Sequence, residues 1–295
     1  HTFTEFAQRM KNDEMITLAK FLAISGIILP MLPHKNLIPD INLTPYSIWL
    51  ATVVVSGISY LSYLLKRYVF HESGTLVSGI IGGLYSSTAT ISVLARKSRK
   101  ASEQEATEYV AAMLLAVSMM FLRFMILILI FSREIFLSIY PYLLIMSVVS
   151  AIVGWFVHSR QKLPKDTSVE SEEDDSSNPL EFKVALIFAV LFVVFTVLTH
   201  YTLVYAGTSG LNLLSFVSGF SDITPFILNL LQNTGSVAVL IITACSMQAI
   251  VSNILVNMFY ALFFAGKRSK LRPWILGGFG AVIACNLVLL LFFYL

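Results

Sequence analysis

Long apolar runs alternate along this chain with short polar breaks. Reading between the breaks, the pattern predicts seven long helices, at about 15–32, 46–65, 107–131, 136–158, 182–205, 236–265 and 272–295. A helix needs about 20 apolar residues to cross a bilayer core of about 30 Å, and these runs are of that order. Thr44 and Pro45 precede the second run and predict a cap followed by a first-turn proline. Two shorter, more polar segments remain, at about 74–95 and 208–231.

Composition identifies the solvent around these helices. The 295 residues are 57% hydrophobic and 13% charged, whereas soluble domains carry about 25% charged residues. We therefore expect an all-α polytopic membrane protein. Cys245 and Cys285 lie in apolar runs, which argues against a disulfide framework or a cysteine metal site. The chain begins with His1, so we expect a fragment or a processed product. The run 15–31 lacks a small-residue cleavage pattern and is interpreted as a membrane helix.

The distribution of lysine and arginine separates two topologies for the polar segments. If both cross the membrane completely, nine of the eighteen basic residues outside the helices lie on each side. If both enter and leave on one side, sixteen lie inside, and only Lys35 and Arg133 lie outside. Because lysine and arginine accumulate in cytoplasmic loops, the sequence predicts two re-entrant helical hairpins, with the N-terminus on the cytoplasmic side. The alternative is a full helix whose Gly and Ser residues serve helix packing.

The first of these segments has the composition of a hairpin tip. Ten residues from Thr75 to Leu84 make about 15 Å of helix, so the sequence Tyr85-Ser86-Ser87 would lie near the bilayer midplane. Non-helical backbone at that depth needs hydrogen-bond partners from protein or from a water-filled cavity. Hydroxyl groups are available at Ser86, Ser87, Thr88 and Thr90. Gly82 and Gly83 would allow a bend and a close approach to a neighbouring helix.

The second polar segment carries a related motif, SGFSDITPF. With an offset of 136 residues, Gly219 matches Gly83, Asp222 matches Ser86 and Thr224 matches Thr88. The order and spacing predict two copies of one unit, a helix, a hairpin and two helices, in opposite orientations. The expected division is an N-terminal segment with the first transmembrane helix (1–45), repeat 1 (46–158), a cytoplasmic acidic linker (159–181) and repeat 2 (182–295).

Inverted repeats whose broken elements meet at the midplane form the substrate site of many secondary transporters. Ionisable residues at that depth are functional candidates, and Asp222 and Arg123 are the two that stand out here. They either neutralise each other or cap backbone, or else Asp222 binds a cation or proton, or Arg123 binds an anion. Asn257 aligns with Arg123 on the corresponding helix. The predicted ion-binding residues are Ser86, Ser87, Thr88, Thr90, Arg123, Ser221, Asp222, Thr224, Asn253 and Asn257, with Gly82, Gly83 and Gly219 as hinge or close-packing positions.

Several motifs resemble a known family. The stretches ILPMLPHKNL, IWLATVVVSGISY, GIIGGLYSSTAT, MMFLRFM, SGFSDIT and IVSNILVN resemble the uncharacterised membrane domain commonly found C-terminal to an MgtC/SapB domain in bacteria and archaea. The resemblance implies a prokaryotic cytoplasmic membrane and an N-terminal MgtC-like partner domain absent from this chain. It implies no substrate. The second hairpin departs from the family's usual Asp-x-Asp-Ala, since this chain has Asp222-Ile223-Thr224-Pro225.

Two functions follow as hypotheses. The first is a membrane transporter or channel for a small inorganic ion, of either sign, with its site at the midplane between the two hairpin tips. The alternative is a non-transporting regulatory or scaffold protein that acts on another membrane protein. We do not expect an enzyme, because no histidine lies at depth near Ser86 or Ser87 and Asp222 is the one deep carboxylate. Partners are expected to be the lipid bilayer and the ion, without a cofactor or nucleic acid. Metal binding and homodimerisation stay open.

Overall fold

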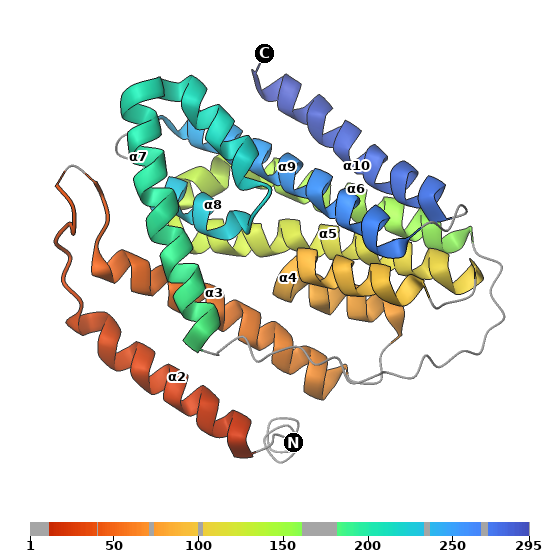
Figure 1. The fold of residues 1–295 in the computed structure, drawn as a ribbon, viewed down its shortest axis with the longest axis horizontal. Helices are drawn as coiled ribbons and strands as arrows, with labels where there is room; N and C mark the ends of the chain where they lie inside the picture. Colours follow the sequence, from red (N-terminus) through yellow and green to blue (C-terminus); the bar gives the residue numbers. More distant parts are fainter. Residues whose placement is uncertain are drawn as a thin grey trace.

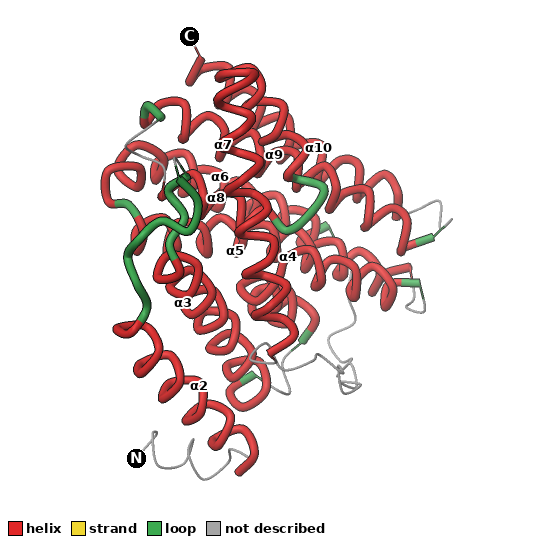
Figure 2. The backbone as a smooth tube through the Cα atoms, turned by 60° about the vertical axis from the view of Figure 1, so that its left-hand side comes forward, coloured by secondary structure: helices red, strands yellow, loops and turns green. Residues whose placement is uncertain are grey.

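The computed structural model describes residues 12–39, 41–70, 74–99, 103–160, 182–232, 237–266 and 271–294. Within these ranges the chain consists of helices joined by short loops, with no strand (Figure 2). Most of the predicted linker 159–181 lies outside the described residues. The elements are α2 (Asn12–Met31), α3 (Pro45–Leu64), the π-helical turn η1 (Leu65–Val69), α4 (Thr75–Ser98), α5 (Glu103–Phe131), α6 (Arg133–Ser159), α7 (Phe182–Ser218), α8 (Ile223–Gln232), α9 (Val239–Ala265) and α10 (Leu271–Tyr294).

The protein is an all-α multi-pass membrane protein. Among the described residues, seven helices are long and apolar enough to cross a bilayer: Pro45–Val69, Thr75–Ser98, Thr107–Phe131, Arg133–Ser159, Val184–Ser218, Val239–Ala265 and Leu271–Phe292. The number agrees with the prediction, but its members differ. Thr75–Ser98 meets the criterion of length and composition, whereas the apolar helix Met15–Met31 is shorter.

Local capping explains where α3 and α6 begin. The Thr44 side chain accepts a hydrogen bond from the Ser47 amide at 3.0 Å, and the Ser47 hydroxyl accepts one from the Thr44 amide at 3.1 Å. This capping box, followed by Pro45, confirms the predicted start of α3. Ser132 alone separates α5 from α6, and its hydroxyl accepts a hydrogen bond from the Ile135 amide at the start of α6.

Helix α4 is broken at Ser86 and folds back on itself. Ser86 has extended dihedral angles, with φ −158° and ψ 108°, between the half-helices 75–85 and 87–98. A Cβ atom on Gly82 would lie 2.5 Å from Oγ1 of Thr90. In a continuous helix these two residues would be about 12 Å apart along the axis. The two halves therefore lie against each other (Figure 1), and residues 85–87 form what we call the first tip.

Helix α7 is broken at Gly207 and is followed by a second turn. Gly207 has φ 58° and ψ −149°, a region open almost only to glycine. The chain turns back sharply there (Figure 1) and continues as the short helix 208–218. Residues 219–222, the second tip, then lead into α8. The predicted hairpin at 208–231 thus corresponds to the helices 208–218 and Ile223–Gln232.

The first half of each hairpin packs in the same register along a later long helix. A Cβ atom on Gly83 would lie 2.6 Å from Cα of Ala116 in α5, and one on Gly219 would lie 2.8 Å from the amide nitrogen of Asn253 in α9. Membrane helices associate by van der Waals packing between small residues, because lipid is as apolar as their side chains. Four contacting pairs share a sequence separation of 33 residues: Gly79 with Ala112, Gly83 with Ala116, Asn212 with Cys245, and Gly219 with Ser252.

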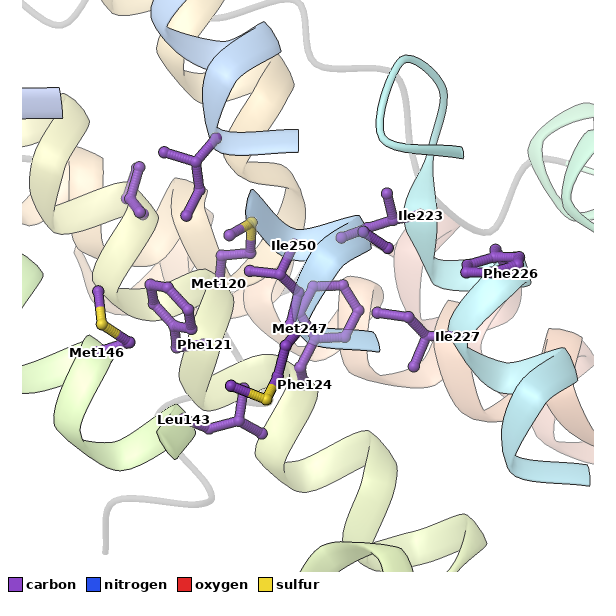
Figure 3. Close-up of a cluster of buried hydrophobic side chains, with 14 of the residues drawn as sticks. Met120, Phe121, Phe124, Leu143, Met146, Ile223, Phe226, Ile227, Met247 and Ile250 are labelled. Carbon is purple, nitrogen blue, oxygen red and sulfur yellow. The ribbon is translucent and has the colours of Figure 1, made fainter. Parts of the chain in front are cut away.

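The second hairpin ends in the centre of the core. Every residue of α8 from Ile223 to Leu231 is buried. In Figure 3, Ile223 and Ile227 of α8 lie beside Phe124 of α5 and Met247 of α9. This packing keeps the start of α8 away from lipid and next to the middle of α5, where Arg123 is located.

Candidate functional site

Arg123 connects the first tip to the start of α8. Its side chain is buried, with 9% of its surface exposed. Nη1 donates a hydrogen bond to the carbonyl oxygen of Tyr85 at 2.8 Å, and Nη2 donates a longer one to Oγ1 of Thr224 at 3.5 Å. The guanidinium therefore lies between segments that are separated by 139 residues of sequence, from 85 to 224.

The position of Arg123 along α5 explains how it reaches the tip. Ala116 faces Gly83, and Arg123 lies seven residues, about 10 Å, further along the helix. Tyr85 lies only two residues beyond Gly83. Because side chains lean toward the N-terminus of their helix, the long arginine side chain returns toward the tip and places its charge there.

The guanidinium keeps unused hydrogen-bonding capacity. Arginine has five N–H donors, and Nε of Arg123 has no hydrogen-bond partner. A buried donor left without a partner costs roughly 1–3 kcal/mol, so an acceptor that reaches Nε would be stabilised. The Asp222 carboxylate interacts electrostatically with Arg123. Asp222 itself is exposed.

Both tips lead into a helix whose N-terminus is capped by the residue the sequence pairs in its two halves. Oγ of Ser86 accepts a hydrogen bond from the Ala89 amide at 3.3 Å, and Oδ1 of Asp222 accepts one from the Thr224 amide at 2.9 Å. Serine and aspartate are both favoured N-caps. The first turn of a helix carries free N–H groups and a partial positive charge, so two such ends lie near Arg123.

Two asparagines of α9 connect to the second tip. Nδ2 of Asn253 donates to the carbonyl oxygen of Gly219 at 3.2 Å. Nδ2 of Asn257 donates to Oδ1 of Asn253 at 3.1 Å. Asn257 is fully buried, yet its Oδ1 has no hydrogen-bond partner. This region therefore holds an acceptor that is free to bind a donor.

Asn257 lies level with the first turn of the second half of α4. Two contacts give the register between the helices: the Arg96 guanidinium lies 4.4 Å from the Phe264 ring centre, and a Cβ on Gly266 would lie 3.2 Å from Nε of Arg99. The helices therefore run parallel. Ala89 is seven residues before Arg96, and Asn257 is seven residues before Phe264.

The structure divides the other predicted residues into two groups. Asp222 and Thr224 join Arg123, and Gly219 joins the two asparagines. The remaining hydroxyl residues make local contacts. Thr90 faces Gly82 inside the folded-back α4, the Ser221 hydroxyl donates to the carbonyl of Ser218, and the Thr88 carbonyl accepts from Ser92. Ser87 is buried in the first turn after the break.

Three contributors were not predicted as site residues. Ala116 and Ser252 are the surfaces against which Gly83 and Gly219 pack. Small residues four apart, Gly79 with Gly83 and Ala112 with Ala116, were a sequence signal for this packing. The third is the Tyr85 carbonyl, for which no residue-type signal exists, because every residue has the same carbonyl group. Within the described ranges no group of three His, Cys, Asp or Glu residues could hold a metal ion.

Comparison with known proteins covers most of the chain. Residues 53–265 match the family described as Domain of unknown function (DUF4010). An uncharacterized protein of Aquifex aeolicus (strain VF5) is 25% identical over 224 residues, which are 75% of this chain and 96% of that protein. No solved structure matches. Both tips, Arg123 and both asparagines lie inside the matched range.

Proposed function

The chain belongs to the DUF4010 family, whose description names no activity, and from the site geometry we propose a membrane transporter or channel for a small inorganic ion. One observation carries the proposal: the buried Arg123 links the first tip to the start of α8 and keeps an N–H without a partner. Charged groups at depth in a membrane protein are costly and commonly mark ion pathways. The ion would bind between the two tips, without covalent chemistry and without a cofactor.

The proposed architecture is an inverted repeat with two re-entrant hairpins. The shared separation of 33 residues in four packing pairs supports it. The bounds of α5 and α6, shifted by 136 residues, become 239–267 and 269–295, close to the observed Val239–Ala265 and Leu271–Tyr294. Broken helices that meet from opposite faces are a common transporter design, in which one repeat moves against the other.

The proposed location is the cytoplasmic membrane of a prokaryote, with the N-terminus and the inter-repeat linker in the cytoplasm. The charge distribution supports the orientation, and the resemblance supports the compartment. An MgtC-like domain and a second copy of the chain are the proposed protein partners.

The polar atoms without partners would hold the ion and its water. Arg123 Nε offers a donor and Asn257 Oδ1 offers an acceptor. Each lies near a helix N-terminus whose amides add further donors. An ion that sheds part of its hydration shell would find both kinds of group at one depth.

Ion flux through liposomes that contain the purified protein tests this proposal. Potassium, sodium, protons, magnesium, chloride and bicarbonate are screened in turn. We expect flux of at least one ion, and we expect Arg123→Gln to lower it at least about tenfold, since a lost buried charge contact costs on the order of 2 kcal/mol or more. The control is Arg133→Gln, which removes an exposed charge at the start of α6. Absence of flux for every ion, from protein shown to be folded, would refute transport.

A regulatory or scaffold protein is the second candidate, and one observation favours it. The Tyr85 and Gly219 carbonyls and the Thr224 amide all have partners inside the chain. A scaffold would need its tip groups satisfied in this way, and folded protein would then carry no ion in the liposome experiment.

A further inference from the structure

We propose that the transported ion is a small monovalent inorganic anion. This inference rests on the proposed function and adds the sign of the charge. It follows from the balance of charges at the two tips, taken together with which of those charges are already occupied.

The positive groups are fixed and incompletely used. Arg123 has 9% of its surface exposed, its guanidinium lies between the first tip and Thr224, and its Nε has no partner. Two helix N-termini open at the same tips, at 87–98 in α4 and at the ten-residue α8. Each end contributes roughly half a positive charge, so the fixed positive charge exceeds that of arginine alone.

The negative charge at the tips is already bound. Oδ1 of Asp222 accepts the Thr224 amide at the N-terminus of α8, and its carboxylate faces the field of Arg123. A carboxylate oxygen thus occupies one of the positions that suit an anion. A cation would meet the buried guanidinium without a second carboxylate to balance it, since no group of three His, Cys, Asp or Glu residues gathers among the described residues.

The two charges therefore predict opposite effects on transport. Arg123 would attract the anion, and Asp222 would compete with it for the N-terminus of α8. Removing the arginine should abolish anion flux, whereas removing the aspartate charge should increase it. If the site takes a cation, the aspartate is the attracting group, and its removal should abolish flux.

Asp222→Asn is the decisive variant. Asparagine caps helices about as well as aspartate, and the residue is exposed, so folding should be preserved. Chloride uptake into liposomes is measured with chloride as the probe, and nitrate, bicarbonate and the cations potassium and sodium are compared. We expect the half-saturating chloride concentration to fall roughly tenfold, because like charges repel strongly where water is excluded. Glu134→Gln, at an exposed position in α6, is the matched control and should change nothing.

Each outcome decides a different claim. Chloride flux that rises with Asp222→Asn and is lost with Arg123→Gln supports the anion site, and Arg123→Lys should keep part of it. Cation flux that Asp222→Asn abolishes overturns the anion inference but leaves ion transport standing. Folded protein that passes no ion removes the transport function itself. If Arg123→Gln does not fold, the direction of the Asp222→Asn effect still decides the sign.

Discussion

At the scale of single residues, the site depends on side chains that are absent. Gly83 and Gly219 let the first half of each hairpin lie against the backbone of α5 or α9. Close approach of this kind maximises van der Waals contact, which holds membrane helices together. It also brings the Tyr85 carbonyl within 2.8 Å of Arg123. The same glycines therefore serve both packing and the position of the proposed ion site.

We predict that Gly83→Ala destabilises the protein by about 1–3 kcal/mol, a typical cost of overpacking. The new Cβ atom would lie 2.6 Å from Cα of Ala116, and backbone cannot move aside as a flexible side chain could. Gly57→Ala is the matched control, since nothing lies within 4 Å of a Cβ there. That change should be neutral or stabilising by about 0.5–1 kcal/mol. Thermal unfolding in detergent measures both, and equal midpoints would contradict the packing argument.

At the scale of elements, broken helices distinguish this fold from a simple bundle. The contacts also correct the sequence alignment of the two halves. Alignment of residue types pairs Asn257 with Arg123, but the packing pairs Ala116 with Ser252. In that register Arg123 corresponds to Phe259, which is 61% exposed. The buried arginine has no counterpart at its own position, and Asn253 binds the carbonyl of the second tip instead.

The folded-back α4 predicts a specific cross-link. In a background with Cys245→Ser and Cys285→Ala, the pair Gly82→Cys and Thr90→Cys should form a disulfide under mild oxidation, because their Cβ atoms would lie 3.2 Å apart, near the usual separation of about 3.5–4.5 Å. Mass spectrometry of the peptide that contains both residues detects the loss of two hydrogens.

The control pair is Thr88→Cys and Arg96→Cys, which has the same separation of eight residues but lies within one half-helix. It should stay reduced. If both pairs behave alike, α4 does not fold back at Ser86.

At the scale of the whole molecule, the hairpins interlock the two halves of the chain. The second half of α4 packs on α9 through Arg96 and Phe264, and α8 packs on α5 beside Phe124 (Figure 3). Each hairpin thus contacts a long helix of its own half and one of the other half. Relative movement of the halves would change the contacts of both tips together, as alternating access requires.

Re-entry of α4 predicts that both of its ends lie on one side of the membrane. Single cysteines at Gly74 and Arg99, both exposed, should react with an impermeant thiol reagent from the cytoplasmic side only. A cysteine at Ser132, between α5 and α6, should react from the opposite side. The experiment uses inside-out and right-side-out vesicles. Labelling of positions 74 and 99 from opposite sides would show that α4 crosses the membrane.

Much of this protein could be read along the chain. Apolar length predicted the membrane class and most helix bounds, because crossing a bilayer depends on consecutive residues. The cap at Thr44 and the break at Ser86 were also predicted, since capping involves groups only a few residues apart. The resemblance to an uncharacterised membrane domain is confirmed as membership of the DUF4010 family.

Only the tertiary structure decided what those residues contact. Sequence analysis selected Arg123, Asp222, Asn253 and Asn257, but not that Arg123 binds the carbonyl of Tyr85 or that Asn253 binds that of Gly219. Backbone carbonyls carry no sequence signal, and their partners come from helices that are distant along the chain. Apolar length and capping are local properties of the polypeptide, whereas the site forms where two hairpins and two long helices meet in space.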